Sequence, residues 1–118
     1  MTSSTIDPAA GLRGEFARHT VGTTARISQM RKSAIYTNGA VPARLKMLAA
    51  LLWSVGARCE PCVKFYAKEA MLAGASDAEV GEMLAIANAM GGCVGETWAM
   101  KAFAAAKAVD GAADACCP

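Results

Sequence analysis

The chain has 118 residues, enough for one domain with a modest hydrophobic core. It is rich in alanine, leucine and methionine and only 6% aromatic, a composition that favours helices over a sheet protein. Residues 1–46 carry seven Lys or Arg against two acids (+5) and residues 47–118 carry five against eight (−3), so the halves can complement each other within a chain or between subunits. The basic residues are scattered without interleaved aromatics, and we therefore expect no nucleic-acid partner.

The amino-terminal segment has neither the basic nor the apolar region of a signal peptide. The longest fully apolar run, Met47–Trp53, is about half a membrane span, so no membrane partner is expected. These features predict a cytoplasmic protein, in a compartment where thiols are kept reduced. Five cysteines in that setting favour catalysis or metal binding over a disulfide scaffold.

The first half of the chain predicts short helices separated by turns. Asp7 followed by Pro8 forms a helix start, because an N-cap acceptor precedes a proline in the first turn. The apolar pattern weakens over 22–24 and resumes at Ile27 and Met30. A turn is expected at 37–39, where Asn and Gly tolerate positive φ.

The second half predicts longer helices with clear boundaries. Pro42 opens a helix that is apolar almost all round from residue 45 to 57, which predicts a buried central helix. The next helix starts near Pro61 and ends before Gly74, and the capping box of Ser76 and Glu79 starts another. A break at 91–92 precedes a last helix from about 93 to 109.

These elements predict an all-α fold, a compact bundle of about six helices with antiparallel neighbours. We expect one domain over residues 1–109 and a flexible, cysteine-containing tail over 110–118. Alanine-rich faces let helices approach closely, and an apolar face left exposed requires another subunit. The protein is therefore expected to be a homo-oligomer.

The sequence Cys59-Glu60-Pro61-Cys62 carries the clearest chemical signal. Two cysteines at this spacing can close and reopen a small disulfide ring, because one thiolate attacks and the other resolves. If the following helix begins near Cys59, both sulfurs lie at its positive end, which favours the thiolate. Arg58 and Lys64 add nearby positive charge. The pattern predicts a redox-active thiol pair.

The order of these elements resembles the alkylhydroperoxidase D (carboxymuconolactone decarboxylase-like) family over roughly residues 40–105. The resemblance is carried by Arg-Cys-Glu-Pro-Cys-Val-Lys at 58–64, Leu-Ala-Gly-Ala-Ser at 72–76 and Ala-Met-Gly-Gly at 89–92. It implies an all-helical fold that assembles as trimers or hexamers. It also implies reduction of a hydroperoxide or disulfide, with Cys62 as the attacking thiol and Cys59 as the resolving one. A dithiol protein, lipoyl or thioredoxin-like, would be the reductant, and no cofactor is expected.

Two positions depart from the pattern of the peroxidase members. Tyr66 stands where they carry a histidine, and Met47 stands where they carry a glutamate. A phenol with its ordinary pKa near 10 can donate a hydrogen bond but is no general base at neutral pH. We therefore expect weak peroxidase activity or a different thiol reaction. The substitute acid–base groups considered are Glu60, Glu69 and Glu96.

Three further cysteines lie outside the pair. Cys93 follows the 91–92 break, and Cys116 and Cys117 end the chain before Pro118. They are candidate resolving or relay thiols, with the tail pair passing electrons to Cys59 and Cys62 or to Cys93. Cys93 packing as a small buried hydrophobe is an equal alternative.

Other readings of the chain stay open. A thiol-based protein could bind a soft metal or metalloid ion through the Cys59–Cys62 pair and the tail pair, or a zinc ion with Cys93 included. The cysteines could be inert core residues or vestigial in a structural oligomer. The lactone decarboxylase branch of the same family is disfavoured, because its members lack the CxxC pair.

Overall fold

The computed structural model describes residues 8–108, which contain helices and no strand. The elements are η2 (Pro8–Leu12), α1 (Arg13–Arg18), α2 (Thr23–Ala34), α3 (Ala43–Ala57), α4 (Glu60–Leu72) and α5 (Asp77–Lys107). The all-α prediction is thus confirmed. None of the helices in this part of the chain is long and apolar enough to cross a membrane.

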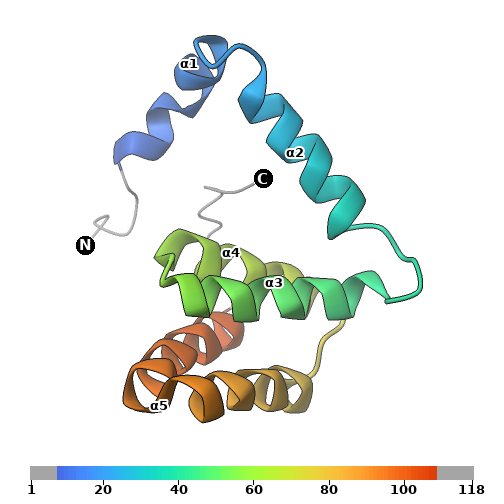
Figure 1. Ribbon diagram of the computed structural model, residues 1–118, viewed down its shortest axis with the longest axis vertical. Helices are drawn as coiled ribbons and strands as arrows, with labels where there is room; N and C mark the ends of the chain where they lie inside the picture. Colours follow the sequence, from blue (N-terminus) through green and yellow to red (C-terminus); the bar gives the residue numbers. More distant parts are fainter. Residues whose placement is uncertain (1–7, 109–118) are drawn as a thin grey trace.

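The helices divide into two regions of unequal packing (Figure 1). Helices α3, α4 and α5 pack on one another and form the bundle, whereas η2, α1 and α2 (residues 8–34, here the arm) extend away from it. No residue of η2, α1 or α2 is buried. The predicted helices are present, but those of the arm bury no side chain against the rest of residues 8–108.

The core lies between α3, α4 and α5. Leu48 and Leu51 of α3 meet Val63 of α4 and Val80 of α5, all at most 1% exposed. Alanines 67, 70, 99, 102 and 106 let the helices approach closely. Ile35 and Tyr36, which follow the last turn of α2, pack against this core and join the arm to the bundle.

Helix α3 is buried on one face only, not all round as its composition predicts. Met47, Leu48, Leu51 and Val55 point into the core, while Trp53 on the same helix is 72% exposed. An apolar sequence is compatible with burial on every side of a helix. In this structure, α4 and α5 cover only one side of α3.

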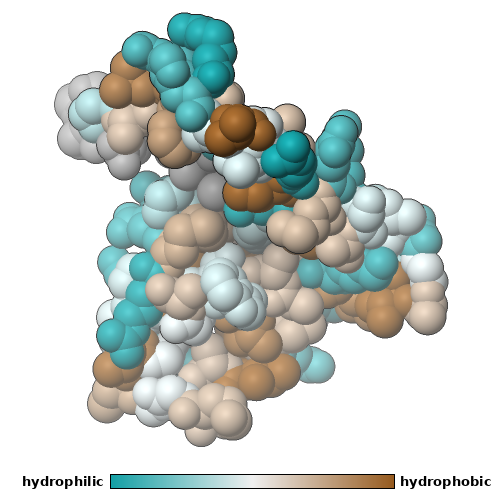
Figure 2. All heavy atoms as spheres, turned by 45° about the horizontal axis from the view of Figure 1, so that its top comes forward, coloured by the Kyte–Doolittle hydropathy of each residue, from teal (hydrophilic) through white to brown (hydrophobic). Residues whose placement is uncertain are grey.

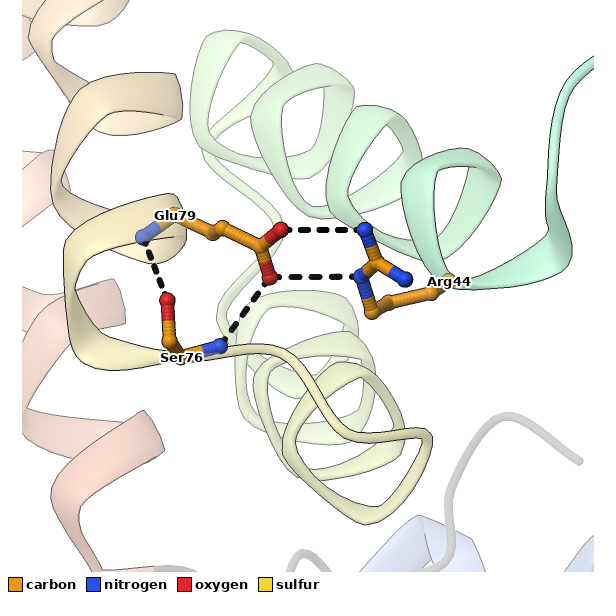
Figure 3. Close-up of polar contacts among 3 residues, drawn as sticks. All are labelled: Arg44, Ser76 and Glu79. Carbon is orange, nitrogen blue, oxygen red and sulfur yellow. Dashed lines mark hydrogen bonds and ion pairs between the residues drawn. The ribbon is translucent and has the colours of Figure 1, made fainter.

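The start of α5 is fixed by the predicted capping box. The Ser76 hydroxyl accepts a hydrogen bond from Glu79 N–H (3.0 Å), and the Glu79 carboxylate accepts one from Ser76 N–H (3.1 Å). Figure 3 shows the Arg44 guanidinium forked onto the same carboxylate, with Nε 3.2 Å from Oε1 and Nη2 3.0 Å from Oε2. The pair joins the first turn of α3 to the first turn of α5, and it is one contact between the basic first half and the acidic second half of the chain.

Helix α5 bends back on itself at the predicted 91–92 break (Figure 1). Gly92 adopts φ 57° and ψ −138°, a conformation open essentially to glycine alone. The two halves then lie side by side: Lys107 near the end pairs with Asp77 at the start (2.5 Å). At Gly95 a Cβ atom would overlap the Ala87 carbonyl oxygen, so the absence of a side chain permits this close contact.

Candidate redox site

The cysteine pair lies at a tight junction between α3 and α4. Arg58 ends α3 in the left-handed conformation (φ 57°, ψ 41°), and Cys59 is the N-cap of α4. Cys59 N–H donates to the Ser54 carbonyl (3.1 Å), and the Cys59 carbonyl accepts from Val63 N–H (2.9 Å). Two residues therefore reverse the chain, and the backbone of Cys59 is held from both sides.

Cys59 and Cys62 are joined by a disulfide, with Cα atoms 5.3 Å apart. Pro61 lies between them in the first turn of α4, where its missing N–H costs no helical hydrogen bond. Both cysteines are half-buried, so the sulfurs are neither inert core atoms nor fully open to solvent. The free N–H groups and positive dipole of the helix end favour a thiolate here after reduction.

Of the two cations near the cysteine pair, Lys64 has an acidic partner and Arg58 has none among the described residues. Lys64 Nζ lies 3.7 Å from Glu60 Oε2, one helical turn away, so this cation and this acid partly neutralise each other. Arg58 is exposed, and its guanidinium takes part in no ion pair or hydrogen bond among the described residues. The unpaired positive charge next to the thiol pair is therefore that of Arg58.

Tyr66 lies one turn after Cys62 on the same helix and is 5% exposed. Its ring packs edge-on against that of Phe65, with the centroids 5.1 Å apart. This locates a buried phenol beside the pair, at the position where the resemblance calls for a histidine.

Tyr36, a residue that the sequence does not single out, joins this cluster from beyond the end of α2. Its hydroxyl is buried and makes no well-directed hydrogen bond among the described residues. Burial raises the pKa of Tyr36 far above its ordinary value; the adjacent Tyr66 and Glu69 raise it further, and Arg31 partly opposes them. The Tyr36 phenol is therefore a hydrogen-bond donor rather than a base at neutral pH.

The candidate carboxylates lie at different places. Glu69 lies close enough to Tyr36 to act on its hydroxyl, whereas Glu60 pairs with Lys64 at the rim of the site. Glu96 is exposed on the second half of α5, and its carboxylate makes no hydrogen bond or ion pair within residues 8–108. Met47, where the resemblance calls for a glutamate, is buried in the core.

The other thiols are separate from the pair. Cys93 starts the second half of α5 directly after the bend and is exposed, so the alternative of a small buried residue is wrong. Cys116 and Cys117 lie outside the described residues. Within residues 8–108 no three His, Cys, Asp or Glu side chains gather closely enough to hold a metal ion, so Cys59, Cys62 and Cys93 do not form a shared site.

The sequence profile of the carboxymuconolactone decarboxylase family matches residues 22–105. The chain belongs to this family. The match includes α2 of the arm, α3, α4 and all but the last two residues of α5, which extends the sequence resemblance towards the amino terminus.

Two known proteins are similar to this family member. A carboxymuconolactone decarboxylase family protein from Legionella pneumophila, solved in its apo form, matches with a TM-score of 0.80 and 22% identity, over 87% of this chain and 91% of that one. At that identity the likeness establishes the fold. An uncharacterised protein from Cupriavidus necator is 37% identical over 67 residues, which are 57% of this chain and 59% of that protein. The matched region thus spans less than two thirds of the relative's length.

Proposed function

We propose that the protein is a thiol–disulfide oxidoreductase that reduces a hydroperoxide or a disulfide through Cys59 and Cys62. The observation that carries the proposal is the disulfide between these residues at the amino-terminal end of α4. Family membership is compatible with thiol redox chemistry. A cytoplasmic location, where a reductant is present, fits such a cycle.

The peroxide cycle consists of three balanced steps. The Cys62 thiolate attacks the outer oxygen of a hydroperoxide, the O–O bond breaks, and an alcohol leaves once its oxygen takes a proton, giving a sulfenic acid. The Cys59 thiol then attacks the Cys62 sulfur, water leaves and the disulfide forms. A dithiol protein of the lipoyl or thioredoxin-like kind donates two electrons and two protons, regenerating both thiols. With a disulfide substrate, the Cys62 thiolate displaces one sulfur and Cys59 releases the other.

Turnover of cysteine variants tests the proposal. Hydroperoxide consumption is followed with a small dithiol as reductant in the wild type, Cys62→Ser, Cys59→Ser and Cys93→Ser. We expect Cys62→Ser to lose turnover. Cys59→Ser should form no intramolecular disulfide and turn over only as fast as the small dithiol itself reduces the Cys62 sulfenic acid. Cys93→Ser, which removes an exposed thiol outside the pair, should retain turnover. Turnover that survives Cys62→Ser would overturn the assignment of the attacking thiol.

In this proposal Tyr66 donates a hydrogen bond to the attacking thiolate or to the leaving oxygen, because its phenol stays protonated at neutral pH. Tyr66→Phe should raise the pKa of the Cys62 thiol and slow the peroxide step. Tyr66→His restores a base, and a positioned base typically contributes about 10²–10⁴ in rate. We expect a gain within that range, measured as the rate of disulfide formation by stopped flow; no gain would mean that proton transfer does not limit the step.

A second copy of the chain is proposed to cover the arm. The arm exposes Leu12, Phe16, Ile27 and Met30 and buries nothing. Figure 2 shows apolar surface on this region among hydrophilic side chains. Its excess of Arg and Lys would meet the acidic side chains of α5, such as Glu82 and Glu96, in a neighbouring copy.

Light scattering on a sizing column tests this assembly. The wild type should elute as a trimer or hexamer, and the double variant Ile27→Glu with Met30→Glu should elute at a lower mass, because two buried charges would oppose association. A monomeric wild type at micromolar concentration would contradict the proposal.

A further inference from the structure

A pocket of about 380 Å³ lies between the last turns of α3 and the bend of α5, and its lining includes Arg58, the residue before Cys59. Its walls are Leu52 and Val55 of α3 and Ile86, Met90 and Val94 of α5. A volume of this size is within the range of small-molecule sites. The pocket exists because α5 turns back at Gly92, which brings residues from both sides of the bend around one space.

Arg58 is the charged residue of the pocket lining. It has no ion-pair partner among the described residues, and its left-handed backbone directs the chain from α3 into Cys59. Arg58 thus contributes the positive charge of an otherwise uncharged lining, and it is next in sequence to the N-cap cysteine of α4.

We propose that this pocket binds a small apolar carboxylate, with its hydrocarbon part against Met90 and Val94 and its carboxylate on Arg58. Removing the hydrocarbon from water drives binding, and the planar guanidinium pairs with a carboxylate through two parallel hydrogen bonds. On the basis of the proposed function, such a molecule in hydroperoxide or disulfide form is the substrate class presented to the Cys59–Cys62 pair.

The unpaired charge favours a carboxylate over a second copy of the chain as the occupant. The central part of a subunit interface is depleted of charged residues, and a guanidinium covered by apolar side chains would lose its water without a partner. A carboxylate ligand supplies both the apolar surface and the missing negative charge.

Binding is tested on the full chain with the Cys59–Cys62 disulfide closed, so that this pair cannot attack a hydroperoxide and the result does not depend on the proposed catalysis. The protein carries ¹³C on its methionine methyl groups, and the Met90 signal is identified with Met90→Leu. Octanoate and octanol are titrated separately into the wild type, Arg58→Gln and Arg58→Lys. Lys101→Gln serves as the matched control, because it removes an exposed cation of α5 that does not line the pocket.

We expect octanoate to shift the Met90 signal saturably and octanol to bind more weakly. Arg58→Gln should weaken octanoate binding about ten-fold, Arg58→Lys should weaken it less because the charge stays while the paired hydrogen bonds are lost, and Lys101→Gln should leave it unchanged. If the chemical shift of the Met90 methyl signal does not change when octanoate is added, the proposal is overturned. Equal binding of octanol, or of octanoate to Arg58→Gln, would overturn the role of Arg58. A signal that shifts only with protein concentration would assign the pocket to a second copy.

Discussion

The arm and the bundle are both helical, but only the bundle buries side chains. Helices α3, α4 and α5 share one core, whereas η2, α1 and α2 leave Leu12, Phe16, Ile27 and Met30 exposed. Short isolated helices are marginal in water, since most helix stability in proteins comes from packing. The comparison indicates that the bundle alone holds the Cys59–Cys62 pair in place, whereas the arm gains little stability from contacts within residues 8–108.

The sharpest test of this comparison uses the same substitution in both regions. Leu51 of the bundle is 0% exposed and Leu12 of the arm is 59% exposed. Leu51→Ala should lower the free energy of unfolding by about 2–5 kcal/mol, through lost burial and the cavity left behind. Leu12→Ala should change it much less at low protein concentration, as measured by urea denaturation.

The dependence on protein concentration separates the two explanations for the arm. If a second copy covers Leu12, the effect of Leu12→Ala should grow as concentration rises, because association adds to apparent stability. Equal losses for Leu12→Ala and Leu51→Ala in the monomer would show that the arm packs on its own bundle and would contradict the distinction drawn here.

The bend of α5 gives a second pair of variants within the bundle. Gly95→Ala places a Cβ atom against the Ala87 carbonyl, whereas Gly81→Ala on the same helix meets nothing within 4 Å. We expect Gly95→Ala to lose about 1–3 kcal/mol from overpacking, and Gly81→Ala to gain up to about 1 kcal/mol from helix propensity. Thermal unfolding measures both, and a stabilised Gly95→Ala variant would contradict the close approach of the two halves.

Tyr36 tests the joint between the two regions. Its buried hydroxyl has no well-directed hydrogen bond, so Tyr36→Phe removes a desolvated polar group without a large loss of packing. Stability should stay equal or rise by up to about 1 kcal/mol, measured by urea denaturation. A clear loss of stability would mean that the hydroxyl is paired, and Tyr66 is the partner to test by the double variant.

The smallest expected effect concerns the ion pair at the start of α5. Hydrogen bonds from Ser76 N–H and from Arg44 hold the pKa of Glu79 below its ordinary value of 4.5. The charged form therefore stabilises the folded chain at pH above 4.5, and this contribution disappears as the pH falls through the lowered pKa. Glu79→Gln should melt slightly below the wild type at pH 7 and match it in acid; a constant difference would point to the cap alone.

The boundaries that could be predicted from sequence are those determined by neighbouring residues. Gly74 after α4, the Ser76–Glu79 capping box and the break at Gly92 each act through local backbone chemistry, and the structure confirms all three. The start of α4 at Cys59 also follows from local signals, because Pro61 can occupy the first turn.

What could not be predicted depends on contacts between distant residues. An apolar helix does not show which face its neighbours cover, so the exposure of Trp53 carries no sequence signal. The arm has an ordinary helical pattern, and the exposure of its apolar side chains within residues 8–108 is visible only in three dimensions. Tyr36 lies near Tyr66 through the path of the chain between α2 and α3, and no motif marks that contact.

The central claim is that Cys59 and Cys62 form one reversible redox pair, and a disulfide map tests it most directly. The protein is reduced, given one equivalent of hydroperoxide and quenched with an alkylating agent, and the bonded pairs are read by mass spectrometry. We predict rapid formation of the Cys59–Cys62 bond with Cys93 still alkylated. Slow oxidation scattered over the five cysteines would contradict a catalytic pair at the start of α4.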